Sequence, residues 1–151
     1  MASYDLGSDW KRNRFAGTLA GPNVDVTGRV TSNSVLAADG LGYRTGAGST
    51  VTQATDKSTG VTINAKTGLI TMNNASLADS TIVSFAVTNS SVGATDMVVL
   101  QHNSGGTLGS YTFNASTFTA GAFQIDVQNV SGATLSDAIV LRFMVFKSVN
   151  A

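Results

Sequence analysis

The sequence predicts an all-β protein: an antiparallel β-sandwich or jelly-roll-like domain at residues 41–151, preceded by an extended N-terminal arm at residues 1–40. Three observations predict this class. Short segments of strand character follow residue 41 and are separated by turn residues, about 8–15 residues apart. No segment of about ten residues or more has helical periodicity. All nine acidic residues are Asp, which favours turns, and Glu, which favours helices, is absent.

The first three predicted strands include a predicted hairpin. Thr50–Gln53 is a short segment in which three of the four residues are β-branched. Gly60–Asn64 and Leu69–Asn73 flank the turn at residues 65–68, in which Gly68 takes the strained backbone position. We therefore expect the second and third strands to pair with each other.

Three of the next four predicted strands have one apolar face. In Thr81–Thr88, Leu108–Asn114 and Ala122–Gln128, apolar side chains recur at alternate positions, as in strands with one buried face. Asp96–His102 ends at the glycine-containing turn of residues 103–106.

The last predicted strand, Asp137–Lys147, is apolar on both faces. One face carries Ile139, Leu141, Phe143 and Val145, and the other carries Ala138, Val140, Met144 and Phe146, interrupted by Arg142. A strand of this kind is covered on both sides. The second cover is either another subunit or the arm of the same chain. If it is a subunit, the contact lies at or near Phe143, Met144, Val145 and Phe146.

The arm has poor hydrophobic periodicity but contains the single Trp and four of the nine basic residues. Aromatic residues are uncommon in disordered tails, so we expect the arm to become ordered on a protein partner. The expected anchoring residues are Trp10, Lys11, Arg12, Arg14 and Phe15. The alternatives are a tail without a role, solvated charges, or a small nucleic-acid motif, which the nearby Asp5 and Asp9 disfavour.

Charge and hydropathy exclude several partners. Nine basic residues balance nine acidic ones, and charged residues make up only 12% of the chain, whereas about 25% is usual. Binding to nucleic acid requires a clustered positive field, so nucleic acid is not expected as a partner. No run of about 18 apolar residues occurs, so no membrane partner is expected either. Residues 1–5 do not begin a signal peptide, because no basic region followed by an apolar core occurs there.

Residue inventory argues against an enzyme. His102 is the only histidine, and a catalytic triad would need it together with Asp96 or Asp126 and a serine on a G-x-S-x-G turn, which is absent. Cys and Glu are absent and the Asp residues are dispersed, so neither a metal nor another cofactor is expected. A pair of distant Asp residues brought together for glycoside cleavage remains the enzymatic alternative.

Two separate parts of the chain resemble a module of tailed-phage and prophage structural proteins. The first is GYRTGAGSTVTQATDKSTGVTIN at Gly42–Asn64, followed by GLITMN at Gly68–Asn73. The second is NVSGATLSDAIVLRFMVFK at Asn129–Lys147. The resemblance covers about residues 41–149, with Ser49 where Gly is usual in the module and Asp56 where Ser is usual.

The resemblance implies a virion protein without catalytic chemistry, generally a homotrimer. The first hypothesis is a capsid cement or decoration protein that bridges subunits of the major capsid protein. The alternative is a head or tail fibre module, with residues 1–40 as the virion anchor and the loops of the β domain binding host glycans. In both cases the protein is made in the cytoplasm of a bacterial host and is located in the virion, at the capsid surface for the first hypothesis.

Overall fold

The structure, a computed structural model, describes residues 42–148. These residues contain eight β-strands and no helix, which confirms the all-β fold class. Each predicted strand overlaps one observed strand. The strands are β1 (Gly48–Thr52), β2 (Val61–Thr62), β3 (Thr67–Thr71), β4 (Ile82–Thr88), β5 (Met97–Ser104), β6 (Tyr111–Thr119), β7 (Ala122–Asn129) and β8 (Val140–Phe146).

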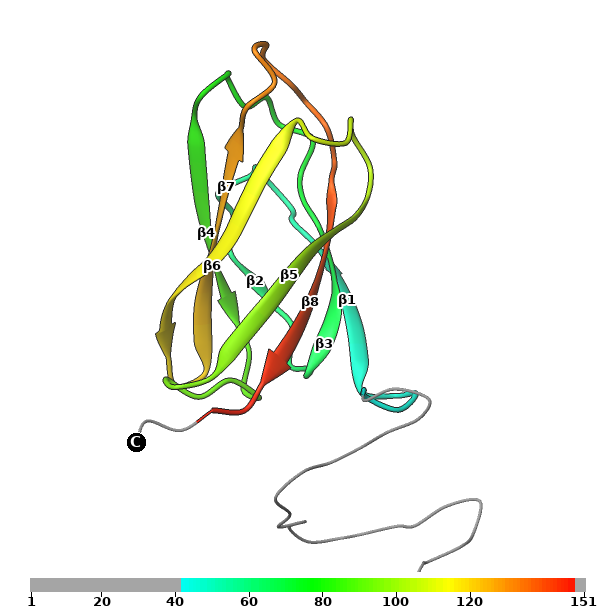
Figure 1. The fold of residues 1–151 in the computed structure, drawn as a ribbon, viewed down its shortest axis with the longest axis vertical. Helices are drawn as coiled ribbons and strands as arrows, with labels where there is room; N and C mark the ends of the chain where they lie inside the picture. The colour runs from blue at the N-terminus through cyan, green and yellow to red at the C-terminus, as the bar shows by residue number, and fades with distance from the viewer. Residues whose placement is uncertain (1–41, 149–151) are drawn as a thin grey trace, which may run out of the picture. The chain divides into compact units, whose positions relative to one another are not determined.

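The strands form two four-stranded sheets that face each other as a sandwich (Figure 1). Sheet 1 has the order β1-β3-β8-β5, and sheet 2 has the order β2-β4-β7-β6. The sheets are mixed and not purely antiparallel as predicted, because β1 pairs with β3 in parallel and β2 pairs with β4 in parallel. Parallel neighbours need a connection that leaves the sheet and returns, and each of these pairs has one.

The predicted hairpin between the second and third strands is wrong. β2 pairs with β4 in sheet 2, whereas β3 lies in sheet 1 between β1 and β8. The chain crosses from one sheet to the other: Ile63 N–H donates to Thr88 O at 2.9 Å, and Lys66 O accepts from Val145 N–H at 2.8 Å. The crossing lets β2 and β3 contribute side chains to one core from opposite sides.

Gly68 therefore has a different role from the predicted one. It lies inside β3 and not in a turn. A Cβ atom at this position would lie 2.6 Å from Ser49 O and 2.9 Å from side-chain atoms of both Ile63 and Phe143. Glycine is required here because neighbouring backbone and core side chains approach closely.

The core lies between the two sheets and follows from the alternation of side chains along the strands. β7 alternates between buried and half-buried residues over its whole length. Phe123 of sheet 2 and Phe143 of sheet 1 are in contact, with ring centroids 6.1 Å apart. The largest fully buried side chains are Phe85, Phe123, Phe143, Ile70, Met72, Ile125, Ile139 and Leu141.

β8 is covered on one face only by the described residues. Leu141, Phe143 and Val145 are completely buried between the sheets. On the opposite face Met144 is half-buried, and Phe146 keeps 42% of its surface exposed. A second cover for this face, as predicted, would have to come from outside residues 42–148.

The sandwich has two ends that differ in the segments they carry. We call one the basal end: it contains the first and last described residues, Gly42 and Ser148, and residues 63–66 and 89–96 (Figure 1). The opposite end, which we call the distal end, contains the loops between β1 and β2, between β5 and β6, and between β7 and β8.

Candidate interaction surfaces

The outer face of sheet 1 carries an apolar patch. Met97 of β5 pairs with Phe146 of β8, and Val99 pairs with Met144, so these four side chains are neighbours on one face. Met97 is 56% exposed and Val99 is 48% exposed. On the other side of β8, half-buried Leu69 of β3 lies on the same face, where it pairs with Arg142. Contiguous exposed apolar side chains of this kind mark interaction surfaces.

Two of the four predicted subunit-contact residues belong to this patch. Met144 and Phe146 are on the outer face, whereas Phe143 and Val145 point into the core and have no exposed surface. The sequence argument did not identify Met97 and Val99. The sequence does contain a pattern that could have identified them. Residues 97–100 read MVVL, so a strand here carries apolar side chains on both faces.

The outer face of sheet 2 is mostly polar, in contrast to the patch on sheet 1; its one large exposed apolar side chain among the described residues is Ile82 of β4. Asp126 of β7 accepts hydrogen bonds from Ser116 Oγ and Ser84 Oγ at 2.6 Å each, and from Asn114 Nδ2 at 3.3 Å. These hydrogen bonds, Ser116 first and then Ser84, lower the pKa of Asp126 from its ordinary value. A polar face with its hydrogen bonds arranged across three strands is suited to contact with water.

The residues weighed for a catalytic triad are not brought together. The His102 ring nitrogen lies 2.7 Å from Gly105 O, and its ring packs edge-on against Phe113. Asp96 forms an ion pair with Lys147 at the basal end, and Asp126 is bonded as described above. Neither carboxylate contacts His102 among the described interactions, so no Ser-His-Asp arrangement forms in residues 42–148.

Within residues 42–148, no three His, Cys, Asp or Glu side chains lie close enough together to hold a metal ion. No helix in the described part of the chain is long and apolar enough to cross a membrane.

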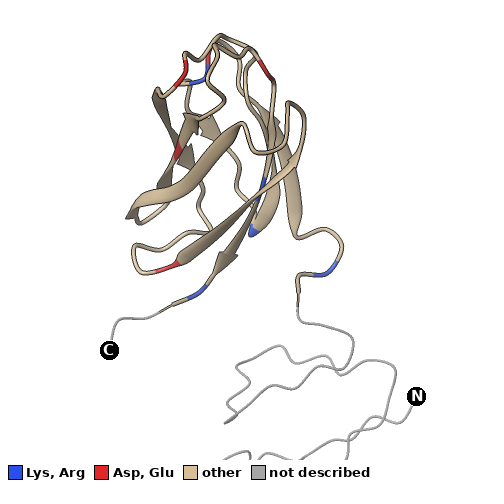
Figure 2. Ribbon diagram, turned by 45° about the horizontal axis from the view of Figure 1, so that its top comes forward, with Lys and Arg blue, Asp and Glu red and all other residues tan. Residues whose placement is uncertain are grey.

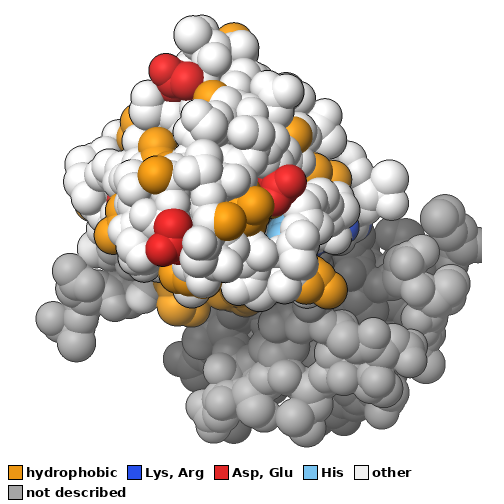
Figure 3. All heavy atoms as spheres, turned by 90° about the horizontal axis from the view of Figure 1, so that it is seen from above, with side chains coloured by type: hydrophobic (Ala, Val, Ile, Leu, Met, Phe, Trp, Pro, Cys, Tyr) orange, Lys and Arg blue, Asp and Glu red, His pale blue; other side chains and the backbone are white. Residues whose placement is uncertain are grey.

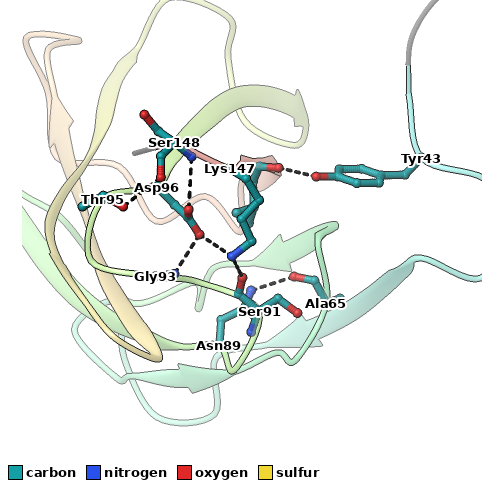
Figure 4. A network of polar contacts seen from close by, with 10 residues as sticks. Tyr43, Ala65, Asn89, Ser91, Gly93, Thr95, Asp96, Lys147 and Ser148 are labelled. Carbon is teal, nitrogen blue, oxygen red and sulfur yellow. Dashed lines mark hydrogen bonds and ion pairs between the residues drawn. The ribbon is translucent and has the colours of Figure 1, made fainter. Parts of the chain in front are cut away.

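At the basal end, a polar network joins the end of β8 to the loop before β5 (Figure 4). Lys147 Nζ donates to Asp96 Oδ2 at 2.6 Å and to Ser91 O at 2.5 Å. Asp96 is buried and also accepts from Gly93 N–H at 2.7 Å. The hydrogen bond from Lys147, followed by that from Gly93, lowers the pKa of Asp96. The network holds the residues that follow β8 in place.

At the distal end, a buried lysine joins two loops. Lys57 is only 4% exposed, and its Nζ donates to Asn73 O at 2.6 Å and to Asp137 O at 2.5 Å. Removal from water lowers the pKa of Lys57, and the charge of Asp137 partly opposes this. Gln53 supports the same loop by donating to Lys57 O at 3.0 Å. Nothing in the sequence pattern distinguished this lysine from an exposed one.

The surface of the distal end is mixed in character. Seen from above, it shows separate acidic side chains among scattered apolar ones (Figure 3). Its loops expose Leu108 by 82% and Val130 by 43%.

The expected anchoring residues lie outside the described residues: Trp10, Lys11, Arg12, Arg14 and Phe15. The anchoring role of the arm therefore stays a prediction.

Comparison with protein-family models, with curated proteins and with solved structures gives no significant match for this chain.

Proposed function

We propose that the chain is a structural protein of a tailed-phage virion, a capsid cement or decoration protein that assembles as a homotrimer and stabilises the shell. The observation that carries the proposal is the difference between the two outer faces. Sheet 1 presents the apolar patch, whereas sheet 2 presents the hydrogen-bonded polar face around Asp126. A domain with one apolar and one polar outer face is suited to assembly through one side.

The proposed trimer contact contains the apolar patch. Phe146, Met97 and Val99 are the large apolar side chains that sheet 1 leaves exposed on this face. A three-fold contact joins different surfaces of neighbouring subunits, so each subunit buries the patch against another part of its neighbour. A cement protein stabilises a shell by binding its assembled form, and many copies add their contributions.

The placement of the first and last described residues also supports the proposal. Both lie at the basal end, and the distal loops lie at the far end of the strands (Figure 1). This arrangement allows attachment of the domain to a particle through one end. The proposed partner there is the major capsid protein or another virion protein.

A second candidate function is supported by the distal loops. Leu108 and Val130 are exposed at the end farthest from residue 42. In a head or tail fibre, loops in this position would face the host and bind its glycans.

Copy number separates the two candidates. Quantitative gel densitometry of purified virions, with the major capsid protein as the internal reference, measures it. A cement protein is expected in amounts of the same order as the capsid protein, whereas a fibre protein is far less abundant. A chain that is absent from purified virions would contradict both candidates.

A further inference from the structure

A shallow hollow at the basal end brings together two cationic side chains. It has a volume of about 530 Å³ and is lined by residues that include Tyr43, Arg44, Asn64, Lys66 and Ser91. The lining therefore offers a guanidinium, an ammonium, a phenol, an amide and a hydroxyl group. Among the described residues, the lining contains no carboxylate.

The backbone that carries the two cations is attached to the end of β8. The Tyr43 hydroxyl donates to Val145 O, and Val145 N–H donates to Lys66 O at 2.8 Å. Arg44 belongs to a turn closed by the hydrogen bond from Ala47 N–H to Arg44 O at 3.2 Å. Lys66 Nζ lies 6.0 Å from the centre of the Tyr43 ring, within the range of a cation–π contact. The hollow is thus built on the segments that precede β1 and β3, and hydrogen bonds connect both segments to the end of β8.

Charge is distributed unevenly along the domain, as Figure 2 shows. Among the described residues, the basal end carries three of the five cations, Arg44, Lys66 and Lys147, against the single carboxylate of Asp96. That carboxylate is paired with Lys147. Within residues 42–148, no carboxylate forms an ion pair with Arg44 or Lys66.

The chemistry of the hollow selects a carboxylate. A guanidinium binds a carboxylate through two parallel hydrogen bonds, and a nearby ammonium adds a charge-assisted one. Asn64 Oδ1 accepts from Ser90 N–H at 2.9 Å, which leaves the Nδ2 group of Asn64 as a further donor. These donors are complementary to an acceptor-only, negatively charged group.

The hollow is open to solvent, which favours a protein partner over a small molecule. Arg44, Asn64 and Lys66 are all exposed, so a small molecule would bury little of its surface here. Small-molecule sites usually enclose most of their ligand. An acidic side chain carried by a protein does not need such enclosure, because an oligomer binds through several sites at once.

We propose that Arg44 and Lys66 form a carboxylate-binding site through which the basal end docks onto an Asp- or Glu-rich segment of a neighbouring protein. This proposal rests on the proposed function in two respects: it takes the neighbour to be a virion protein and the chain to be an oligomer.

Peptide binding tests the site directly. The probe is a fluorescein-labelled peptide of ten glutamates, and its binding to the full-length chain is measured by fluorescence anisotropy at low and at physiological salt concentration. All proteins carry K11Q, R12Q, R14Q and R29Q, so that the four cations of the arm do not compete. Arg44→Gln with Lys66→Gln is expected to weaken binding at least tenfold. Arg142→Gln, an exposed cation on sheet 1, is the control and is expected to change binding less than twofold.

Several results would overturn the proposal. No binding of the peptide by the parent chain would do so, and so would an equal loss in the Arg142→Gln control, which would indicate general charge attraction. Equal competition by free glutamate at the same carboxylate concentration would show a site for small acids and not for a protein segment. Circular dichroism checks that the double variant is folded.

Particle binding separates this proposal from the proposed function. Chains with native arms are added to particles that lack the protein, and co-sedimentation is measured. Weaker attachment of the Arg44→Gln, Lys66→Gln chain supports the docking role, whereas attachment equal to that of the parent chain overturns it and leaves the virion function intact. If the parent chain itself does not attach although it binds the peptide, the virion function fails and the partner named here fails with it, while the carboxylate site stands.

Discussion

Phe123 and Phe143 come from different sheets and pack against each other at the centre of the sandwich, with their ring planes inclined by 54°. Both side chains have at most 1% of their surface exposed. Phe143 therefore belongs to the core between the sheets, although the sequence pattern placed it at or near a subunit contact. Its neighbour in the chain, Met144, points to the opposite side and belongs to the apolar patch.

The first prediction concerns this contact. Phe143→Ala leaves a cavity between the sheets and is expected to lower the free energy of unfolding by about 3–5 kcal/mol. Leu108→Ala, in an exposed distal loop, is the control and should change it by less than about 0.5 kcal/mol. Urea denaturation followed by circular dichroism measures both. Equal effects of the two substitutions would contradict the assigned core.

The second prediction concerns assembly. Phe146→Asp places a charge in the apolar patch, and burying it in a subunit contact is unfavourable, so we expect at least a tenfold weaker trimer. Ile82→Asp makes the same change at a residue of β4 that is 60% exposed and should leave assembly unchanged. Sedimentation equilibrium measures the association of each variant. A wild-type chain that is a stable monomer at micromolar concentration would contradict the trimer.

The third prediction concerns the buried lysine. Lys57→Met leaves the carbonyl groups of Asn73 and Asp137 without their donor and should lower the free energy of unfolding by about 1–2 kcal/mol. Lys66→Met makes the same change at an exposed position and should have a much smaller effect on stability. Thermal and urea unfolding of both variants at neutral pH provide the comparison. A stable Lys57→Met protein would show that the distal loops do not depend on this contact.

The fourth prediction concerns acid stability. The hydrogen bonds from Ser116 and Ser84 lower the pKa of Asp126 in the folded chain below the ordinary value of 3.8. The unfolded chain then binds the proton more readily, so the stabilisation by ionised Asp126 is present above about pH 4 and is lost as the pH falls through the folded pKa. Asp126→Asn should lower the free energy of unfolding by about 1 kcal/mol at pH 7, a small effect because Asp126 is partly exposed to water.

The pH dependence distinguishes this effect from a loss of packing. The stability difference between wild type and Asp126→Asn should shrink as the pH is lowered from 7 to 2, in urea titrations at each pH. Ser84→Ala should reduce the same pH dependence in part, because it removes one of the donors. A difference that is constant over this pH range would show that the hydrogen-bonded carboxylate does not carry the effect.

The fifth prediction concerns the arm. Removal of residues 1–30 should leave a folded β domain that attaches to particles at least tenfold more weakly, because Trp10 and the basic residues beside it are lost. Co-sedimentation with particles that lack the protein measures attachment, with circular dichroism as the folding control. Attachment close to that of the full chain would move the whole anchoring role to the domain. Unfolding of the truncated chain would show that the boundary near residue 40 is wrong.

The sequence by itself determined where the strands lie and, for β4, β6 and β7, which face points inward. Alternation of apolar and polar side chains is a local property, and it was sufficient to identify β7 and to place Phe123, Ile125 and Val127 on its buried side. The sequence pattern also identified the apolar residues on both faces of β8. Which face contacts the core is a different matter, because both faces of Asp137–Lys147 have almost the same composition.

The tertiary structure alone decided which strands pair. β2 and β3 are adjacent in sequence and separated by a turn-like segment, yet they lie in different sheets. The choice depends on contacts between residues far apart in the chain, such as Lys66 with Val145, and local pattern carries no information about these. The same holds for the candidate sites. Arg44 and Lys66 share a hollow only because β1 and β3 begin side by side, in parallel, at the basal end of sheet 1.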